Sequence, residues 1–323
     1  MTARALVAPD SFKGTLSACE VAAALARGLR AEGVEAEELP LADGGEGTLE
    51  ALVAALGGEL RHAVVEDPLG RPVEAAYALL PDGRTAIVEM AEASGLRLVS
   101  DDDRDPLAAS TRGTGELIAA AAEAGAARIV VTVGGSATTD GGAGALEALQ
   151  EVGLEVELEV VCDVRTAWED APRLYGPQKG ADTETVRRLE ARLDELARRA
   201  PRDPRGVPHT GAAGGLAGGL WAFLGARLLP GAAYVLDAVG FDARTREADL
   251  VVTGEGRLDE QTFEGKVVAE VAARSGRAGR ACHAVVGEDA LGRERAAELG
   301  LASVLEAGTI AELEAAGRAL ATR

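Results

Sequence analysis

Three lysines are set apart from the other basic residues of this chain. Among its 33 basic residues, only Lys13, Lys179 and Lys266 are lysines, and each lies beside a glycine. The ammonium group of lysine is a compact point charge, which the planar guanidinium group of arginine does not replace at a site for a small anion. We therefore interpret these three positions as candidates for binding phosphate or carboxylate groups.

Glycine-rich loops hold these lysines and several carboxylates. Glycine lets backbone N–H groups approach an anion closely, and a loop that opens a helix also offers the positive end of the helix dipole. Phosphoryl transfer needs cations on the phosphates, carboxylates on Mg²⁺ and a base near the acceptor hydroxyl. The loops together favour that chemistry, although each acid alone is equally well explained as a helix cap. They are DSFKG (10–14), ADGGEG (42–47), GGSATTDGG (134–142), GPQKG (176–180), GAAGGL (211–216) and GEGRLD (254–259).

The loop GGSATTDGG directly follows a strand expected at residues 127–133. Its backbone N–H groups and hydroxyls are suited to nucleotide phosphates, and Asp140 is a candidate ligand for Mg²⁺. The sequence contains neither the P-loop pattern nor a G-x-G-x-x-G pattern after its first strand, so neither familiar nucleotide fingerprint is present. The candidates for binding the ATP phosphates are Gly134, Gly135, Ser136 and Thr138.

The acidic composition excludes some classes of partner. With 33 basic and 53 acidic residues, the 323-residue chain carries a formal net charge of −20, which opposes nucleic-acid binding. Cys19, Cys162 and Cys282 lack the spacing of a metal or disulfide motif. No stretch is long and apolar enough for a membrane span, and the first apolar run is too short for a secretory signal. We therefore expect a cytoplasmic protein.

The elements that must position these loops alternate between strands and helices. A strand at 3–9, a helix at 17–31 and a second strand at 34–42 indicate a parallel sheet, whose loops gather at the carboxyl ends of its strands. From about 60 to 90, two turn signals between alternating runs indicate antiparallel strands. We predict an α/β protein with a Rossmann-like parallel sheet built from both chain ends and an inserted α/β domain with a mixed sheet.

The length of the chain favours two domains rather than one. We predict that residues 1–62 and 280–323 form the discontinuous Rossmann-like domain and that residues 63–279 form the inserted domain. The active site is expected in the cleft between them.

A series of motifs, in order along nearly the whole chain, resembles the bacterial glycerate kinase family. The resemblance implies an ATP-dependent glycerate 2-kinase, which transfers the γ-phosphoryl group of ATP to D-glycerate and yields 2-phosphoglycerate and ADP with Mg²⁺. It also implies two α/β domains, one of them Rossmann-like and formed by both chain ends. The motifs are VAPDSFKGTLSACEVA, PLADGGEGT, DPLGRPV, GTGELI, GGSATTDGG, YGPQKGA, GAAGGLAGGL, VVTGEGRLDEQT and GK.

Each candidate residue is given a role on this basis. Lys13 follows the first strand, and we expect it to contact the transferring phosphoryl group or the glycerate carboxylate. Asp43 is the favoured base and Asp10 the alternative, because Asp43 is embedded in glycines. Glu46 or Asp140 is expected to hold Mg²⁺. The remaining candidates are Ser11, Lys179, Arg257 and Lys266 for the substrate, and Glu255 and Asp259 for the cofactor.

Two other functions remain open from the residues alone. One is a kinase for another small hydroxy acid or sugar acid, because nothing in the sequence separates acids of different length. The other is a nucleotide-binding regulator without catalysis, which the many acids and lysines in the loops disfavour. We expect a monomer or a homodimer that binds glycerate and ATP.

Overall fold

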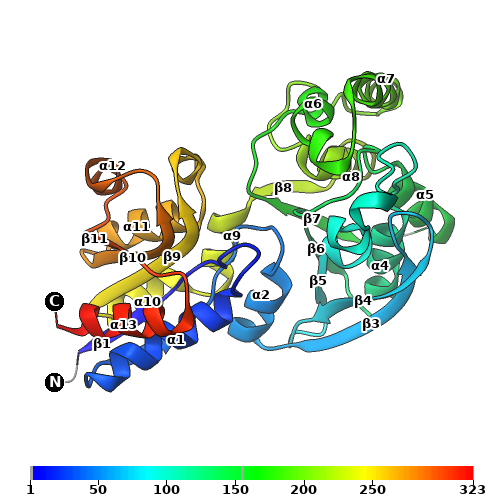
Figure 1. The fold of residues 1–323 in the computed structure, drawn as a ribbon. Helices are drawn as coiled ribbons and strands as arrows, with labels where there is room; N and C mark the ends of the chain where they lie inside the picture. Colours follow the sequence, from blue (N-terminus) through cyan, green and yellow to red (C-terminus); the bar gives the residue numbers. More distant parts are fainter. Residues whose placement is uncertain (1–2, 154–155, 323) are drawn as a thin grey trace. The chain divides into compact units, whose positions relative to one another are not determined.

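The computed structural model describes residues 3–153 and 156–322, which divide into two compact units. The first unit contains the residues up to Asp43, the segment Glu50–Leu56 and the residues from Pro230 onward, and Figure 1 colours it mostly blue and yellow to red. The second unit contains Gly44–Leu49 and Gly57–Leu229. We predicted the second boundary near residue 280, whereas the first unit already begins again at Pro230.

The first unit is built around a parallel sheet with the strand order β11-β10-β9-β1-β2. The strand β9 lies between β1 and β10, which explains why the chain from Pro230 belongs to this unit. The sheet therefore joins strands from both ends of the chain, as the sequence predicted. The strands are β1 (Arg4–Val7), β2 (Glu35–Glu38), β9 (Leu250–Leu258), β10 (Ala281–Asp289) and β11 (Ser303–Glu306).

Helices from the two chain ends pack against each other in this unit. Helix α1 (Ala18–Ala31) begins at a capping box formed by Ser17 and Glu20, and it lies beside α13 (Ile310–Ala321) in Figure 1. Glycine is required at this contact, because a Cβ atom on Gly28 would lie 2.1 Å from the carbonyl oxygen of Glu314. The other helices are α9 (Gly231–Ala238), α10 (Phe241–Glu247), α11 (Val267–Arg277) and α12 (Arg293–Glu298), while α2 (Thr48–Leu56) begins in the second unit and ends in the first.

The second unit contains a mixed sheet with the order β3-β4-β5-β6-β7-β8. Antiparallel pairs join β3 to β4 and β4 to β5, whereas β5, β6 and β7 are parallel. The turn signals near residues 67–72 and 81–84 therefore lie where the sequence indicated antiparallel strands. The strands are β3 (Glu59–Glu66), β4 (Pro72–Leu79), β5 (Thr85–Glu89), β6 (Arg128–Thr132), β7 (Glu157–Cys162) and β8 (Arg227–Pro230).

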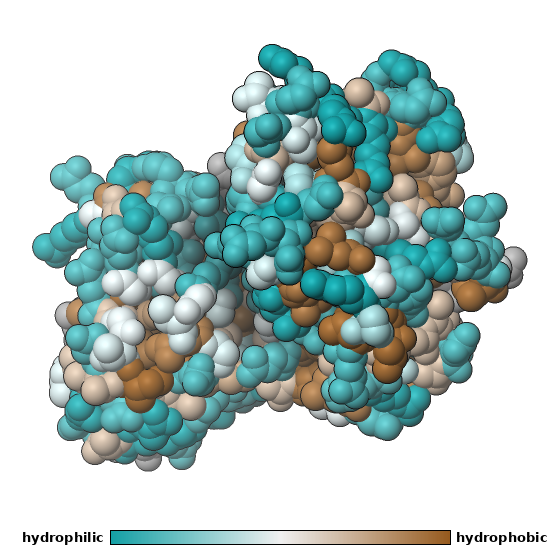
Figure 2. All heavy atoms as spheres, turned by 45° about the vertical axis from the view of Figure 1, so that its right-hand side comes forward, coloured by the Kyte–Doolittle hydropathy of each residue, from teal (hydrophilic) through white to brown (hydrophobic). Residues whose placement is uncertain are grey.

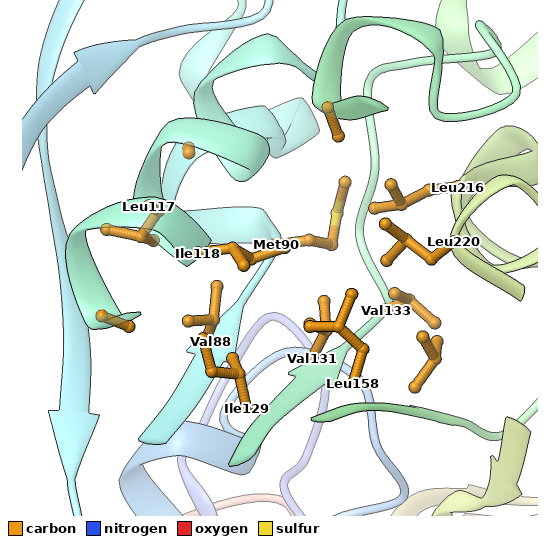
Figure 3. Close-up of a cluster of buried hydrophobic side chains, with 14 of the residues drawn as sticks. Val88, Met90, Leu117, Ile118, Ile129, Val131, Val133, Leu158, Leu216 and Leu220 are labelled. Atoms are coloured by element: carbon orange, nitrogen blue, oxygen red, sulfur yellow. The ribbon is translucent and has the colours of Figure 1, made fainter. Parts of the chain in front are cut away.

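One hydrophobic core holds this sheet against its helices. Figure 3 shows side chains of β5 and β6 meeting Leu117 and Ile118 of α4 (Arg112–Glu123) and Leu216 and Leu220 of α8 (Leu216–Leu224). All of these are almost completely buried, which makes the core the main source of stability for the unit. The remaining α-helices are α3 (Ala91–Ser94), α5 (Ala143–Val152), α6 (Ala171–Tyr175) and α7 (Thr183–Arg199).

The surface is mainly polar on the face that Figure 2 draws. Most of the face drawn in Figure 2 is hydrophilic, and its apolar residues form scattered groups. In the part of the chain that the structure describes, no helix combines the length and the apolar character that a membrane span requires.

Candidate active site

A cavity of about 420 Å³ in the first unit lies at the carboxyl ends of the parallel strands. Ligands of open α/β sheets bind at this edge, because the loops that follow the strands gather there. The cavity is lined by the loop after β1, by Asp43 after β2, by the end of β9 and by Lys266 at the start of α11. Gly287 and Glu288 of β10 and Gly308 complete the lining.

Three carboxylates of the cavity are almost completely buried. Asp10, Asp43 and Glu255 are 5%, 2% and 6% exposed. Burial raises the pKa of Asp10 well above its ordinary value, and the charge of Asp43 raises it further. Burial also raises the pKa of Glu255 to about 7, against a hydrogen bond of 2.7 Å from the hydroxyl of Thr262. The cavity therefore concentrates negative charge that the protein only partly compensates.

The cations of the cavity lie at its more exposed positions. The Nζ atom of Lys13 is 3.4 Å from Oδ2 of Asp43, yet the Lys13 side chain is 66% exposed. Lys266 precedes α11, and its Nζ atom is 3.4 Å from Oε1 of Gln261. Arg257 contacts Glu288 at 2.8 Å. The side chains of these cations can reach a bound anion without any movement of the buried carboxylates.

Eight of the predicted site residues line this one cavity, and the others do not. Asp259 also caps a short 3₁₀ helix at Glu260–Glu264 by accepting a hydrogen bond from the N–H of Gln261. The residues in the lining are Asp10, Ser11, Lys13, Asp43, Glu255, Arg257, Asp259 and Lys266. The predicted residues that belong to the second unit are Glu46, Gly134, Gly135, Ser136, Thr138, Asp140 and Lys179.

Lys179 is a buried residue whose hydrogen bonds hold the 134–142 loop. Its side chain is buried, and its Nζ atom donates to Oγ of Ser136 at 2.8 Å and to the carbonyl oxygen of Thr138 at 2.5 Å. Burial lowers the pKa of Lys179 to about 7, although the charge of Asp140 opposes the shift. The lysine thus fixes the shape of the loop from inside, and its predicted contact with the substrate stays a prediction.

Both carboxylate oxygens of Asp140 accept hydrogen bonds from residues of the second unit. Its Oδ2 atom accepts hydrogen bonds from the N–H of Thr111 at 2.9 Å, from the Thr111 hydroxyl at 2.8 Å and from the N–H of Gly144 at 3.1 Å. Its Oδ1 atom accepts from the N–H of Gly142 at 3.1 Å. The side chain is 1% exposed. This geometry explains Asp140 as a structural acceptor and gives no support to the prediction that it holds Mg²⁺.

The glycines of the same loop are required by close packing against the 44–49 segment. A Cβ atom on Gly134 would lie 2.6 Å from Cα of Gly45, and one on Gly135 would lie 2.4 Å from Oε1 of Glu46. Gly135 also has a φ of 63°, which favours glycine. The loop therefore lies beside Glu46, an exposed residue, while its binding of ATP phosphates stays a prediction.

Two buried residues of functional interest were missed by the sequence reasoning. Thr262 hydrogen-bonds Glu255, and Glu89 accepts hydrogen bonds from the 44–49 segment. Glu89 ends the apolar run TAIVE, so an acid at the end of an apolar run was the available signal. No such signal exists for Thr262, because a threonine near a turn is common.

The cavity offers carboxylate oxygens, which are the ligands that Mg²⁺ prefers. Among residues 3–153 and 156–322, no three histidine, cysteine or acidic side chains lie close enough to hold a metal by themselves. Mg²⁺ in kinases is usually held by one or two carboxylates together with substrate phosphates. Asp10 and Glu255 supply oxygen donors of that kind, and both line the cavity. The cavity therefore fits Mg²⁺ that arrives with a nucleotide.

A parallel α/β sheet with lysines and buried carboxylates at its carboxyl edge is the arrangement expected of a small-molecule phosphotransferase. The family model "Glycerate kinase family" matches residues 5–154 and 149–319. Glycerate kinase of Bacillus subtilis (strain 168) is 44% identical over 309 residues, which cover 83% of this chain and 80% of the relative. Glycerate 2-kinase of Escherichia coli (strain K12) is 42% identical over 306 residues, with coverage of 83% and 80%.

A solved structure supports the same relationship. The crystal structure of a protein provisionally assigned as glycerate kinase 2 from Salmonella typhimurium LT2 matches with a TM-score of 0.85 and 38% identity, covering 100% of this chain and 98% of the other. The chain therefore belongs to the glycerate kinase family, whose members are kinases. The resemblance in the sequence motifs and the predicted α/β fold are both confirmed.

Proposed function

We propose that this chain transfers the γ-phosphoryl group of ATP to the 2-hydroxyl of D-glycerate and yields 2-phosphoglycerate and ADP. The observation that carries the proposal is the cavity in which Lys13 lies beside Asp43, with buried Asp10 and Glu255 in the same lining. Choice of the 2-hydroxyl is supported by the E. coli relative, which is named glycerate 2-kinase. Glycerate is small enough for a cavity of about 420 Å³ together with the end of a triphosphate.

Asp43 is the base in this proposal, and Asp10 is the alternative. The glycerate hydroxyl oxygen forms a bond to the γ-phosphorus, the bond from that phosphorus to the bridging oxygen of ADP breaks, and the hydroxyl proton passes to the carboxylate. Lys13 stabilises the negative charge on the transferring group. Its ammonium group lies 3.4 Å from Asp43 and is therefore next to the proposed base. Lys266 and Arg257 bind the glycerate carboxylate.

Asp10 and Glu255 are the residues that would hold Mg²⁺, which when bound neutralises charge on the phosphate oxygens. Glu46 stays the alternative from the sequence, because its exposed side chain lies against Gly135 of the predicted phosphate loop. A site in a cleft between the two domains and a monomeric or homodimeric state also stay predictions.

The test is to incubate the purified protein with ATP, Mg²⁺ and D-glycerate, to follow ADP formation and to identify the product by ³¹P NMR. A 2-phosphoglycerate signal is the expected result. A 3-phosphoglycerate signal would keep the kinase but contradict the proposed orientation of glycerate. A panel of longer hydroxy acids and sugar acids serves as the control, and faster turnover of any of them would replace glycerate as the substrate.

A further inference from the structure

Glu89 is a buried carboxylate that has no role in the proposed chemistry. It ends β5, is 5% exposed and does not line the cavity of the first unit. Its Oε1 atom accepts a hydrogen bond from the N–H of Gly47 at 3.0 Å, and its Oε2 atom accepts one from the N–H of Leu49 at 3.0 Å. One side chain therefore holds two backbone groups that lie 40 or more positions away in the sequence.

These two N–H groups belong to the start of α2, where the first N–H groups of a helix have no partner within the helix. The segment before them depends on glycine, because Gly44 and Gly47 have positive φ angles of 92° and 85°. A backbone contact adds to this anchoring, because the N–H of Val133 donates a hydrogen bond to the carbonyl oxygen of Gly44 at 3.0 Å. Glu89 thus holds the 44–49 segment through two hydrogen bonds within the second unit.

The anchored segment is joined directly to Asp43, the proposed base. Asp43 is the last residue of the first unit before the chain enters the second, and the chain returns to the first unit at Glu50. Because Gly44 follows Asp43, the position of the segment constrains the backbone from which the Asp43 carboxylate extends. A displacement of about 1 Å at a reacting group is enough to cost roughly 100-fold in rate.

We propose that Glu89 is a positioning residue for phosphoryl transfer, which acts through the 44–49 segment on Asp43. This inference rests on the proposed function. A carboxylate suits the task because it offers an acceptor oxygen to each of the two N–H groups, whereas an amide offers one oxygen and a second donor. Burial raises the pKa of Glu89 to about 7, and the hydrogen bonds from the N–H groups of Leu49 and Gly47 oppose that shift.

The test compares Glu89→Gln with the matched control Glu159→Gln. Glu159 is also a buried acid of the same sheet, 3% exposed on β7, but it pairs with Arg227 at 2.9 Å. For each variant, kcat, the KM values for ATP and glycerate, and Tm are measured. We expect Glu89→Gln to lower kcat by about 10- to 100-fold and to change either KM by less than about threefold, whereas Glu159→Gln lowers Tm and leaves kcat near wild type.

A double-mutant cycle shows whether Glu89 acts through Asp43. If it does, Glu89→Gln adds little to the loss already caused by Asp43→Asn, because both changes remove the same base. Losses that simply multiply, or a folded Glu89→Gln enzyme with wild-type kcat, would overturn the proposal. Should Glu89→Gln not fold, Glu89→Asp, which keeps both acceptor oxygens on a shorter side chain, is measured against the same expectations.

Amide hydrogen exchange separates this inference from the proposed function. Exchange at Gly47 and Leu49 should become faster in Glu89→Gln, while exchange in the core strand β6 stays unchanged. A wild-type enzyme that does not phosphorylate glycerate contradicts the proposed function. Unchanged exchange at the two amides contradicts the anchoring whatever the substrate is.

Discussion

The cavity of the first unit and the 134–142 loop of the second use the same residue types in opposite ways. Both combine glycines and aspartate with a lysine, which for the 134–142 loop is Lys179 from a separate loop. In the 134–142 loop, Asp140 accepts hydrogen bonds from the protein on both oxygens, and Lys179 donates to Ser136 and Thr138. In the cavity, burial raises the pKa values of Asp10 and Glu255.

The difference shows how to separate structural charges from functional ones. A buried charge that the protein satisfies stabilises one conformation, whereas a buried charge that faces a cavity costs stability until a ligand compensates it. Substitutions in the cavity should therefore reduce activity and preserve the fold. Substitution of Asp140 or Lys179, which hold the 134–142 loop from inside, should mainly reduce stability.

The largest effect is expected at the proposed base. Asp43→Asn should lower kcat by about 10²- to 10⁴-fold, because the amide cannot accept the hydroxyl proton. Circular dichroism and Tm should remain near wild type, since the change removes a buried charge. Asp10→Asn is assayed in parallel over a range of Mg²⁺ concentrations: a loss larger than that of Asp43→Asn that extra Mg²⁺ does not reverse would move the role of base to Asp10.

Asp140→Ala should be the most damaging change in the 134–142 loop. It removes the acceptor for donors on Thr111, Gly142 and Gly144, so we expect a loss on the order of 3 kcal/mol in the free energy of unfolding. Urea unfolding measures this free energy. The Asp140→Ala protein that remains folded should keep the kcat of wild type. If Asp140 instead held Mg²⁺, stability would change little and the Mg²⁺ concentration needed for half-maximal activity would rise.

Lys179 should give the loop a stability that depends on pH. Burial lowers its pKa from 10.5 to about 7, so between these values the unfolded chain binds more protons than the folded protein. The contribution of Lys179 to the free energy of unfolding therefore rises with pH across this window. We expect the free energy of unfolding of wild type, relative to that of Lys179→Met, to be larger at about pH 9.5 than at about pH 7. Urea unfolding at both pH values measures it. A difference independent of pH would contradict the buried position.

The smallest effect is expected from Glu255→Gln in metal-free buffer. Burial raises the pKa of Glu255 from 4.5 to about 7, so the folded protein binds more protons in this range and the free energy of unfolding falls as pH rises through it. Above pH 7 the variant should therefore have a Tm equal to or slightly higher than that of wild type. Activity should fall in the same variant, and a clear loss of Tm would indicate a structural role instead.

Much of the fold could be predicted from the sequence, because local patterns determine it. The helix predicted at 17–31 is α1, and the antiparallel strands expected from about 60 are β3 and β4. The boundary near 280 was wrong because no local signal shows that β9 inserts between β1 and β10. Sheet order is a long-range property that periodicity does not contain.

The candidate site was predictable only in part, for a related reason. Lys13 and Lys179 have the same pattern in the sequence, a lysine followed by glycine. Only their burial distinguishes them, because Lys13 is exposed at the cavity and Lys179 is buried under the 134–142 loop. Asp140 likewise resembled the acids of the cavity until its donors were known. Glu89 was missed because its partners lie 42 and 40 positions away.

The most direct test of this account compares kcat of Lys13→Met with that of Lys179→Met, both shown to be folded. We predict that Lys13→Met loses about 10²- to 10³-fold in kcat, because it removes a donor to the transferring group, and that Lys179→Met stays within about tenfold of wild type. Normal turnover in Lys13→Met together with loss of turnover in a folded Lys179→Met would contradict the account and move the chemistry to the 134–142 loop.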